Sequence, residues 1–507
     1  MIIVDCTLDS VMIHCVRLER SSPITSFNPE RRFEQVPDSH NHPVSVQDGI
    51  DLRALLAVLL AVALSALDTA IANTALPTIG SDLHAPASAS IWVINAYQLS
   101  IVASLLPLAA LGDLWGPRRV FLWGLGIFTA FSLACALSSD LQTLALCRWG
   151  QGFGAAGIMS VNIALIRVLF PKERLGRGVG FNALVVGVSS ALGPTVASLV
   201  LLVAPWQWLF GLNVPLGLLA LWFAWPAIPR MHKGSQEVDK HGLKVGGAKS
   251  ATDHTFDPLT AIATALTFGC LIYALTAAAQ RHSSYQLVPF VVLGLIALIY
   301  LLRRQRSHPA PMLPVDLLKR PMFALSTLTS ITSFAAQGLA FVALPFYFEQ
   351  TLHRDSVETG FLITTWPILV AIAAPIAGRL SDKYPPGLLG GIGLSVLSFG
   401  FVLLAMLPSN PSVLHIVICM AICGVGFGGF QSPNLKAIMS SAPPNRSGGA
   451  SGVIAMGRLI GQTSGAAVVA LCLGLWGDSM GPLIALAIGA GFAGLAALAS
   501  FSRLWVE

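Results

Sequence analysis

Residues 54–76 read ALLAVLLAVALSALDTAIANTAL, an apolar stretch that contains one charged residue, Asp68. A helix of about 20 such residues crosses the roughly 30 Å hydrocarbon core of a bilayer. Because lipid offers no partners for backbone amides, apolar stretches of this length are expected to be helices. Thirteen more follow, each bounded by Pro, Gly or charged residues, at 90–111, 120–138, 142–166, 179–203, 207–226, 259–279, 287–302, 323–347, 361–378, 388–407, 413–438, 449–475 and 481–502.

The composition of the whole chain excludes a water-soluble globular protein. Of its 507 residues, 54% are hydrophobic and 11% are charged, against roughly 25% charged residues in soluble domains. The net charge of +6 does not indicate nucleic-acid binding, because the basic residues are spread over short loops. Cys419 and Cys423 share a helix face, but apolar packing explains them better than a metal site, and no metal is expected.

The distribution of Lys and Arg predicts the orientation of the chain. If the N-terminus is cytoplasmic, all but four of the 30 basic residues lie in the leader, in cytoplasmic loops or in the tail. The exceptions are Arg281 and Arg354 in outer loops and Arg148 and Arg458 inside spans. This asymmetry predicts fourteen transmembrane helices with both termini in the cytoplasm.

A repeat divides these spans into two sets of six around an inserted pair. Chance similarity between Gly-rich helices is the alternative, but the matches keep one order and a nearly constant spacing, as in many transporters. The matched residues, first copy then second, are 75–77 with 343–345, 152–154 with 426–428, 171–174 with 443–446, and Asp113 with Asp382. The predicted parts are a disordered cytoplasmic leader (1–51), a six-helix bundle (52–226), a linker (227–258), the inserted pair (259–302), a second linker (303–322), a second bundle (323–503) and a cytoplasmic tail (504–507).

Charged side chains inside the predicted spans suggest a mechanism. Asp68 and Arg148 both lie roughly 10–14 Å from the outer helix ends, at about 1.5 Å per residue, so they can pair across the bundle. The repeat matches them to Ala336 and Ile422, so the charges are not duplicated. A buried acid that faces a cation suits proton coupling or cation binding, and a static salt bridge is the alternative. Arg458 has no evident carboxylate partner, and snorkelling to the cytoplasmic interface is expected for it.

Two further segments are predicted to take part in conformational change. The cytoplasmic turn at residues 112–119, GDLWGPRR, predicts a latch between helices, with a plain polar turn as the alternative. Small residues and a proline in the fifth span predict a kink, close packing and a role in gating. The residues concerned are Asp113, Gly116, Arg118 and Arg119 in the turn and Gly187, Gly193 and Pro194 in the span.

Motifs for nucleotide chemistry are missing or lack the required context. The GxGxxG patterns at 424–429 and 489–494 lie within continuous apolar stretches with no strand before them. The chain has no Walker A sequence and no nucleophile elbow. An ATP-driven pump and an enzyme are therefore not expected.

The motifs together resemble the fourteen-span drug:proton antiporters of the major facilitator superfamily, the DHA2 group, over residues 52–503. Residues 67–77 resemble the first-span signature, and 113–119 resemble the motif between the second and third spans. The fourth-span motif is matched by Arg148, Gln151 and Gly152. The fifth-span motif is matched by residues 187–194, and the sixth-span motif by residues 206–215. The resemblance implies an all-α polytopic membrane protein with the major facilitator fold, 14 transmembrane helices arranged as 6 + 2 + 6.

The resemblance also implies a function. Protonation of Asp68 from the periplasmic side would drive export of drugs, biocides or other amphipathic, often cationic, molecules across the inner membrane by alternating access. Export of an endogenous metabolite, peptide or siderophore is the alternative, and a non-transporting sensor is a third reading. No cofactor and no nucleic acid are expected; a monomer is expected, and a periplasmic adaptor or outer-membrane partner stays open.

The residues expected to act fall into three sets. Proton coupling is assigned to Asp68 and Arg148. Gating and conformational change are assigned to Asp113, Gly116, Arg118, Arg119, Gln151, Gly152, Gly187, Gly193, Pro194 and Asp382. The cargo cavity is assigned to polar and aromatic residues of the spans, namely Asn73, Trp92, Tyr97, Gln98, Asn213, Gln337 and Trp366.

Overall fold

The computed structural model describes residues 51–170, 175–228, 258–279, 284–306, 317–442 and 447–506, which lie within one compact unit. Within these ranges every regular element is a helix, and none is a strand. Twelve of the described helices are long and apolar enough to cross a membrane, which confirms an all-helical polytopic protein but not the predicted count of fourteen. Outside the described ranges lie the predicted leader up to residue 50, Arg281, most of the first linker, half of the second linker and the turns at 171–174 and 443–446.

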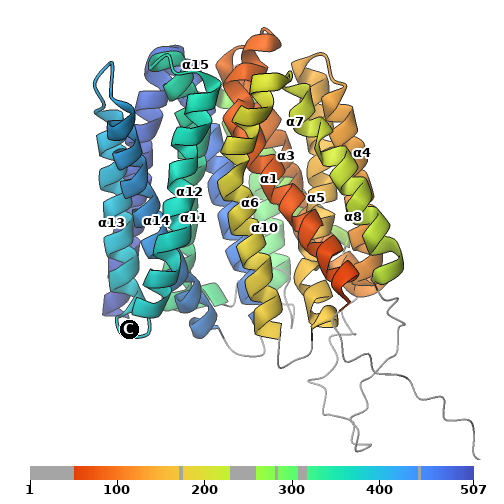
Figure 1. The fold of residues 1–507 in the computed structure, drawn as a ribbon. Helices are drawn as coiled ribbons and strands as arrows, with labels where there is room; N and C mark the ends of the chain where they lie inside the picture. The colour runs from red at the N-terminus through yellow and green to blue at the C-terminus, as the bar shows by residue number, and fades with distance from the viewer. Residues whose placement is uncertain are drawn as a thin grey trace, which may run out of the picture. The chain divides into compact units, whose positions relative to one another are not determined.

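The first half of the chain forms the helices drawn from red to yellow-green in Figure 1. Helix α1 packs against α6 and α8, and α5 packs against both α3 and α4. Helix α1 continues through Pro77, where the sequence predicted its end, because a proline removes only its own amide donor and spans tolerate this. The helices are α1 (Leu52–Asp82), α2 (Ala87–Ser90), α3 (Trp92–Trp115), α4 (Pro117–Ala136), α5 (Leu141–Leu169), α6 (Leu175–Val203), α7 (Gln207–Gly211) and α8 (Asn213–Ala227).

The remaining helices include one that is far longer than a bilayer is thick. Helix α15 has a non-helical residue, Gly477, with φ of 75°, which divides it into two helices. Helices α9 and α10 pack on each other, and α9 also contacts α3 and α15. The helices are α9 (Pro258–Ala279), α10 (Ser284–Arg306), α11 (Pro321–Phe346), the π-helix η4 (Tyr347–Thr351), α12 (Ser356–Leu380), α13 (Pro386–Ala405), α14 (Val413–Ser441) and α15 (Ser447–Phe501).

Glycine contacts show that the two halves share one packing scheme. A methyl group added to Gly154 of α5 would lie 2.7 Å from the carbonyl oxygen of Gly124 on α4. In the same way, a methyl group on Gly426 of α14 would lie 2.8 Å from the carbonyl oxygen of Gly393 on α13. Such contacts let the helix backbones approach closely, as small residues do in membrane helix pairs.

This packing corrects one match made from the sequence. Arg148 lies six residues before Gly154, and Met420 lies six residues before Gly426. The structural counterpart of Arg148 is therefore Met420, not Ile422. The fourth and twelfth predicted spans both contain several glycines two residues apart, so the sequence alone could be aligned with an error of two residues.

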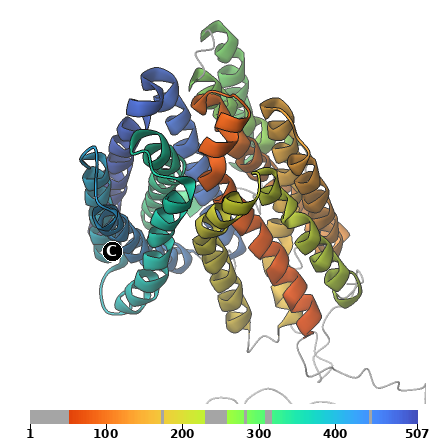
Figure 2. The ribbon, with the colours of Figure 1, turned by 45° about the horizontal axis from the view of Figure 1, so that its top comes forward.

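The two halves meet along α6 and α12, which lie side by side in Figures 1 and 2. The hydroxyl groups of Thr195 and Thr364 are 2.8 Å apart, and Ser198 Oγ donates to the carbonyl oxygen of Ser356 at 2.8 Å. Helix α1 also contacts α11, and α3 contacts α15. One apolar cluster contains buried residues from α1, α11 and α15, so the halves share part of their core.

Candidate functional site

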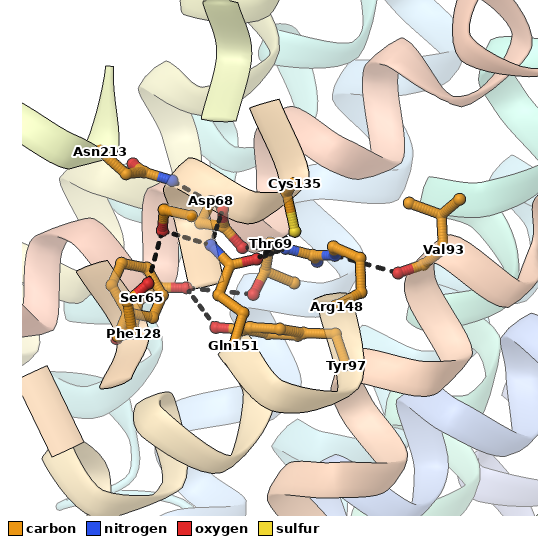
Figure 3. A network of polar contacts seen from close by, with 11 residues as sticks. Ser65, Asp68, Thr69, Val93, Tyr97, Phe128, Cys135, Arg148, Gln151 and Asn213 are labelled. Carbon is orange, nitrogen blue, oxygen red and sulfur yellow. Dashed lines mark hydrogen bonds and ion pairs between the residues drawn. The ribbon is translucent and has the colours of Figure 1, made fainter. Parts of the chain in front are cut away.

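The two charges singled out in the sequence meet inside the first half. Asp68 of α1 and Arg148 of α5 are 2% and 1% exposed. Arg148 Nη1 lies 2.5 Å from Asp68 Oδ2, which is a direct ion pair (Figure 3). Burial of an unpaired charge is very unfavourable, so each charge depends on the other for its place in the interior.

The second oxygen of Asp68 has two amide donors. Gln151 Nε2 donates to Asp68 Oδ1 at 2.9 Å, and Asn213 Nδ2 donates to the same oxygen at 2.8 Å. Asn213 is the first residue of α8, so the carboxylate connects α1 to α5 and to α8. The three donors together satisfy the ionised form of the acid.

Arg148 is also held by α3. Its Nε donates to the carbonyl oxygen of Val93 at 3.0 Å, and its Cζ lies 4.1 Å from the ring centroid of Tyr97. Tyr97 is 1% exposed and its hydroxyl donates to the carbonyl oxygen of Ser65 at 3.3 Å. A cation over an aromatic face is stabilised most where both groups are buried, and Arg148 and Tyr97 are both buried.

Helix α4 supplies two residues that the sequence analysis missed. Gln151 Nε2 donates to Ser132 Oγ at 2.8 Å, and Cys135 Sγ donates to Gln151 Oε1 at 3.6 Å. No motif marks either residue. The available signal was the pair Thr129 and Ser132, which lie three residues apart and therefore on one face of a helix that is otherwise apolar after Arg119.

The residues predicted to line a cavity fall into separate groups. Tyr97 and Asn213 belong to the Asp68 network, and Trp92 contacts the Tyr273 ring of α9 with centroids 5.6 Å apart. Gln337 accepts a hydrogen bond from Gln462 Nε2 at 3.2 Å. Three buried polar atoms in this set have no hydrogen-bond partner in the described part of the chain, namely Asn73 Oδ1, Gln98 Oε1 and Trp366 Nε1.

The turn at residues 112–119 is built around a glycine in the left-handed region. Gly116 has φ of 88° between α3 and α4, a conformation that favours glycine. Arg118 Nη2 donates to the carbonyl oxygen of Trp225 near the end of α8 at 2.5 Å, and Arg119 is exposed. Arg118 therefore ties the turn to the last helix of the first half. The side chain of Asp113 lies outside the described part of the structure.

The fifth-span motif lies where the halves touch. A methyl group added to Gly193 would be 2.3 Å from Ala70 Cβ of α1, and one added to Gly360 of α12 would be 2.6 Å from the Pro194 carbonyl oxygen. Close packing is therefore confirmed at Gly193 and Pro194. Gly187 has open space around its Cα, and no packing reason for a glycine is visible there.

In the second half, Asp382 pairs with a lysine. Lys436 Nζ of α14 lies 2.6 Å from Asp382 Oδ1 and also donates to the carbonyl oxygen of Ser381 at 2.8 Å. Arg503, the last residue of the predicted second bundle, is fully buried. It donates to Asn434 Oδ1 at 2.8 Å, so it joins the C-terminal end to α14.

Comparison with known proteins identifies the family. The sequence model described as Major Facilitator Superfamily matches residues 58–466. The chain belongs to the Major Facilitator Superfamily. The transporter YebQ of Escherichia coli (strain K12), described as uncharacterized, is 48% identical over 89% of this chain and 95% of its own length.

More distant relatives of this superfamily member differ in what their names say they carry. The riboflavin transporter RibZ of Clostridioides difficile (strain 630) is 27% identical over 78% of this chain and 82% of its own. The multidrug resistance protein Stp of Mycobacterium tuberculosis (strain CDC 1551 / Oshkosh) is 27% identical over 84% of this chain and 76% of its own. The expected kinship with the superfamily's drug antiporters is thus supported by relatives with multidrug resistance names.

A solved structure supports the same fold. The bacterial homolog of the human lysosomal transporter Spinster, in an inward-facing and unoccupied conformation, has a TM-score of 0.63 to this chain. It is 14% identical, and the match covers 90% of this chain and 98% of that protein. At this identity the likeness concerns the fold alone.

Proposed function

We propose that this transporter is a proton-coupled antiporter that exports amphipathic small molecules by alternating access. The observation that carries the proposal is the buried pair of Asp68 and Arg148, 2.5 Å apart and absent from the equivalent place in the second half. An ionisable pair in a membrane interior is expensive and marks function by default.

The hydrogen bonds of Asp68 give the proton a mechanical effect. A protonated carboxyl group loses its charge, and one of its oxygens becomes a donor. The ion pair with Arg148 then ends, and the amide N–H groups of Gln151 and Asn213 face an oxygen that accepts less well. Proton binding therefore loosens the hold of α1 on α5 and α8. Because α1 also contacts α6 and α11, this change reaches the contact between the two halves.

The proposed topology has fourteen spans with both termini in the cytoplasm. The last candidate span covers Gly452–Trp505, and α15 as a whole has 55 residues. At about 1.5 Å per residue this helix far exceeds a hydrocarbon core of roughly 30 Å. If α15 crosses twice, with the crossings separated at Gly477, it adds one span to the twelve candidates. The 22-residue α9 adds another, which gives fourteen.

The cargo is proposed as a drug-like amphipathic molecule, with an endogenous metabolite as the second candidate. The name of the Stp protein supports the first, and the name of the RibZ protein supports the second. The proposed setting is a monomer in the inner membrane, driven by the proton gradient without ATP or another cofactor. Competition between dyes and metabolites for transport into inverted vesicles separates the two cargo classes.

The test replaces the acid and keeps its shape. Asp68→Asn in proteoliposomes is expected to abolish proton release triggered by cargo, measured with a pH-sensitive dye over a panel of dyes, biocides and metabolites. Asp355→Asn, an exposed acid at the start of α12, is the matched control and is expected to behave as the wild type. Normal proton release by the Asp68→Asn protein would refute the role of this residue.

A further inference from the structure

Arg458 is a charged residue inside a candidate span, and it takes no part in the Asp68 network. It lies on α15, six residues after the start of the candidate span at Gly452. Its side chain is partly exposed, whereas Met456 and Leu459 beside it are 3% and 4% exposed. No residue in the described ranges forms an ion pair or a hydrogen bond with its guanidinium group.

The neighbours of Arg458 on α15 show which way its side chain faces. Met456 and Leu459 pack in a core cluster with residues of α1 and α3, and Gly457 lies against Ile331 of α11. Arg458 lies one helical turn before Gln462, so these two residues share a face of α15. Gln462 is hydrogen-bonded to Gln337 of α11. The faces of α15 on both sides of Arg458 pack on other helices, and a guanidinium group that faces hydrocarbon is very unfavourable. We therefore place the exposed part of Arg458 toward the bundle interior, not in the snorkelling position that the sequence predicted.

An aromatic surface continues this polar strip. Phe341 lies one turn after Gln337 on α11, is partly exposed, and has its ring centroid 5.6 Å from that of Trp366. Trp366 is fully buried, and its Nε1 has no acceptor among the residues that the structure describes. The strip from Arg458 to Phe341 thus presents a cation, two amides and an aromatic face.

We propose that Arg458, Gln462, Gln337 and Phe341 form the cargo-binding surface of this transporter, and that its cargo is a planar aromatic molecule bearing an oxyanion. The guanidinium group of Arg458 has no acceptor among the residues that the structure describes, which fits a carboxylate or phenolate oxygen of the cargo. The aromatic face of Phe341 suits a flat ring system. This inference rests on the proposed export function and narrows its cargo, because a fixed positive charge repels the organic cations that the sequence resemblance implied.

The test uses two dyes that share a ring system and differ in charge. Fluorescein is an anionic xanthene and rhodamine 6G a cationic one, and their binding to the purified full-length protein is measured by fluorescence anisotropy. The wild type is expected to prefer fluorescein. Arg458→Gln is expected to weaken fluorescein binding by about 10- to 100-fold, as for a lost hydrogen bond to a charged group. Arg458→Lys is expected to retain part of the affinity, because the charge remains and the planar fork is lost.

The control and the outcomes separate this inference from the proposed function. Arg303→Gln, an exposed arginine on α10, is expected to bind both dyes as the wild type does. Unchanged or increased rhodamine 6G binding by Arg458→Gln shows that the variant is folded. The inference fails if the wild type does not bind fluorescein, or if Arg458→Gln binds it as well as the wild type does. If rhodamine 6G is instead carried in an Asp68-dependent way, proton-coupled export stands and the anionic cargo class falls.

Discussion

Two regions at equivalent places in the two halves have opposite chemistry. In the first half, Asp68, Tyr97, Arg148 and Gln151 form a buried network of charges and hydrogen bonds. Their counterparts in the second half are Ala336, Trp366, Met420 and Cys423, all at most 1% exposed. The pairing of Tyr97 with Trp366 follows from the glycine contacts, because their carbonyl oxygens lie against Gly152 and Gly424 respectively.

The second region is held together by apolar and aromatic packing. The ring of Trp366 lies 5.7 Å from that of Phe401 and 6.4 Å from that of Phe427, centroid to centroid. The residues of this cluster are uncharged, whereas the first region contains the ion pair of Asp68 and Arg148. The same helix scaffold therefore carries a charged, hydrogen-bonded region in one half and an apolar, aromatic region in the other.

The largest expected effect on stability comes from replacing Arg148 by methionine, the residue at its counterpart, Met420. Arg148→Met is expected to lower the free energy of unfolding by about 3–5 kcal/mol, because Asp68 is left as a buried, uncompensated charge. The double variant Asp68→Ala with Arg148→Met copies the pattern of Ala336 and Met420. It is expected to recover most of the lost stability, since an apolar replacement of a buried ion pair is often neutral. Denaturant unfolding in detergent, followed by tryptophan fluorescence, measures both.

The double variant also separates stability from function. It is expected to show no proton release triggered by cargo, although it is folded. If the double variant is no more stable than Arg148→Met alone, the unpaired charge of Asp68 is not what lowers the free energy of unfolding of Arg148→Met.

Parts of this comparison could be predicted from the sequence, and parts could not. Asp68 and Arg148 were paired correctly, because they are conspicuous charges at equal depth in apolar spans. Asn213 was assigned to a cavity, because a polar residue in a span does not reveal its partner across the bundle. No role was predicted for Arg503 at the end of the second bundle, because its contact with Asn434 depends on a packing of helix ends that no local pattern encodes.

A smaller effect is expected from removing one donor of the polar network. Asn213→Leu deletes the 2.8 Å hydrogen bond to Asp68 Oδ1 and leaves the contacts from Arg148 and Gln151. A hydrogen bond to a charged group contributes about 1.5–3 kcal/mol, so the loss of unfolding free energy should fall in this range. The same unfolding assay measures it, and slower proton release triggered by cargo is expected alongside.

The control for this variant is another buried asparagine. Asn162→Leu breaks a 2.8 Å bond to Asn182 Oδ1 between neutral amides, for which about 1 kcal/mol is expected. An equal loss in both variants would mean that the charge of Asp68 adds nothing to the bond with Asn213, and the contrast between the two regions would weaken.

The smallest effect concerns the caps that begin α5 and α14, which again occupy equivalent places. Asp140 caps α5 by accepting from the Thr143 amide at 2.8 Å, and Ser412 caps α14 by accepting from the His415 amide at 3.3 Å. The hydrogen bond from the Thr143 backbone, followed by that from its hydroxyl, lowers the pKa of Asp140 below its ordinary value of 3.8. A lowered pKa in the folded state stabilises it above pH 3.8, and this contribution is lost as the pH falls through the folded-state pKa.

Replacing the charged cap by the neutral one of the other half tests this difference. Asp140→Ser is expected to leave the unfolding midpoint nearly unchanged at pH 7, because serine is also a good N-cap. On acidification below pH 3.8 the wild type should lose more stability than the variant, because only the wild type must protonate a cap. Thermal unfolding scans at neutral and acidic pH measure the difference. Ser412→Ala at α14 should lower stability by a similar amount at both pH values, and a pH-dependent loss there would contradict the distinction between the two caps.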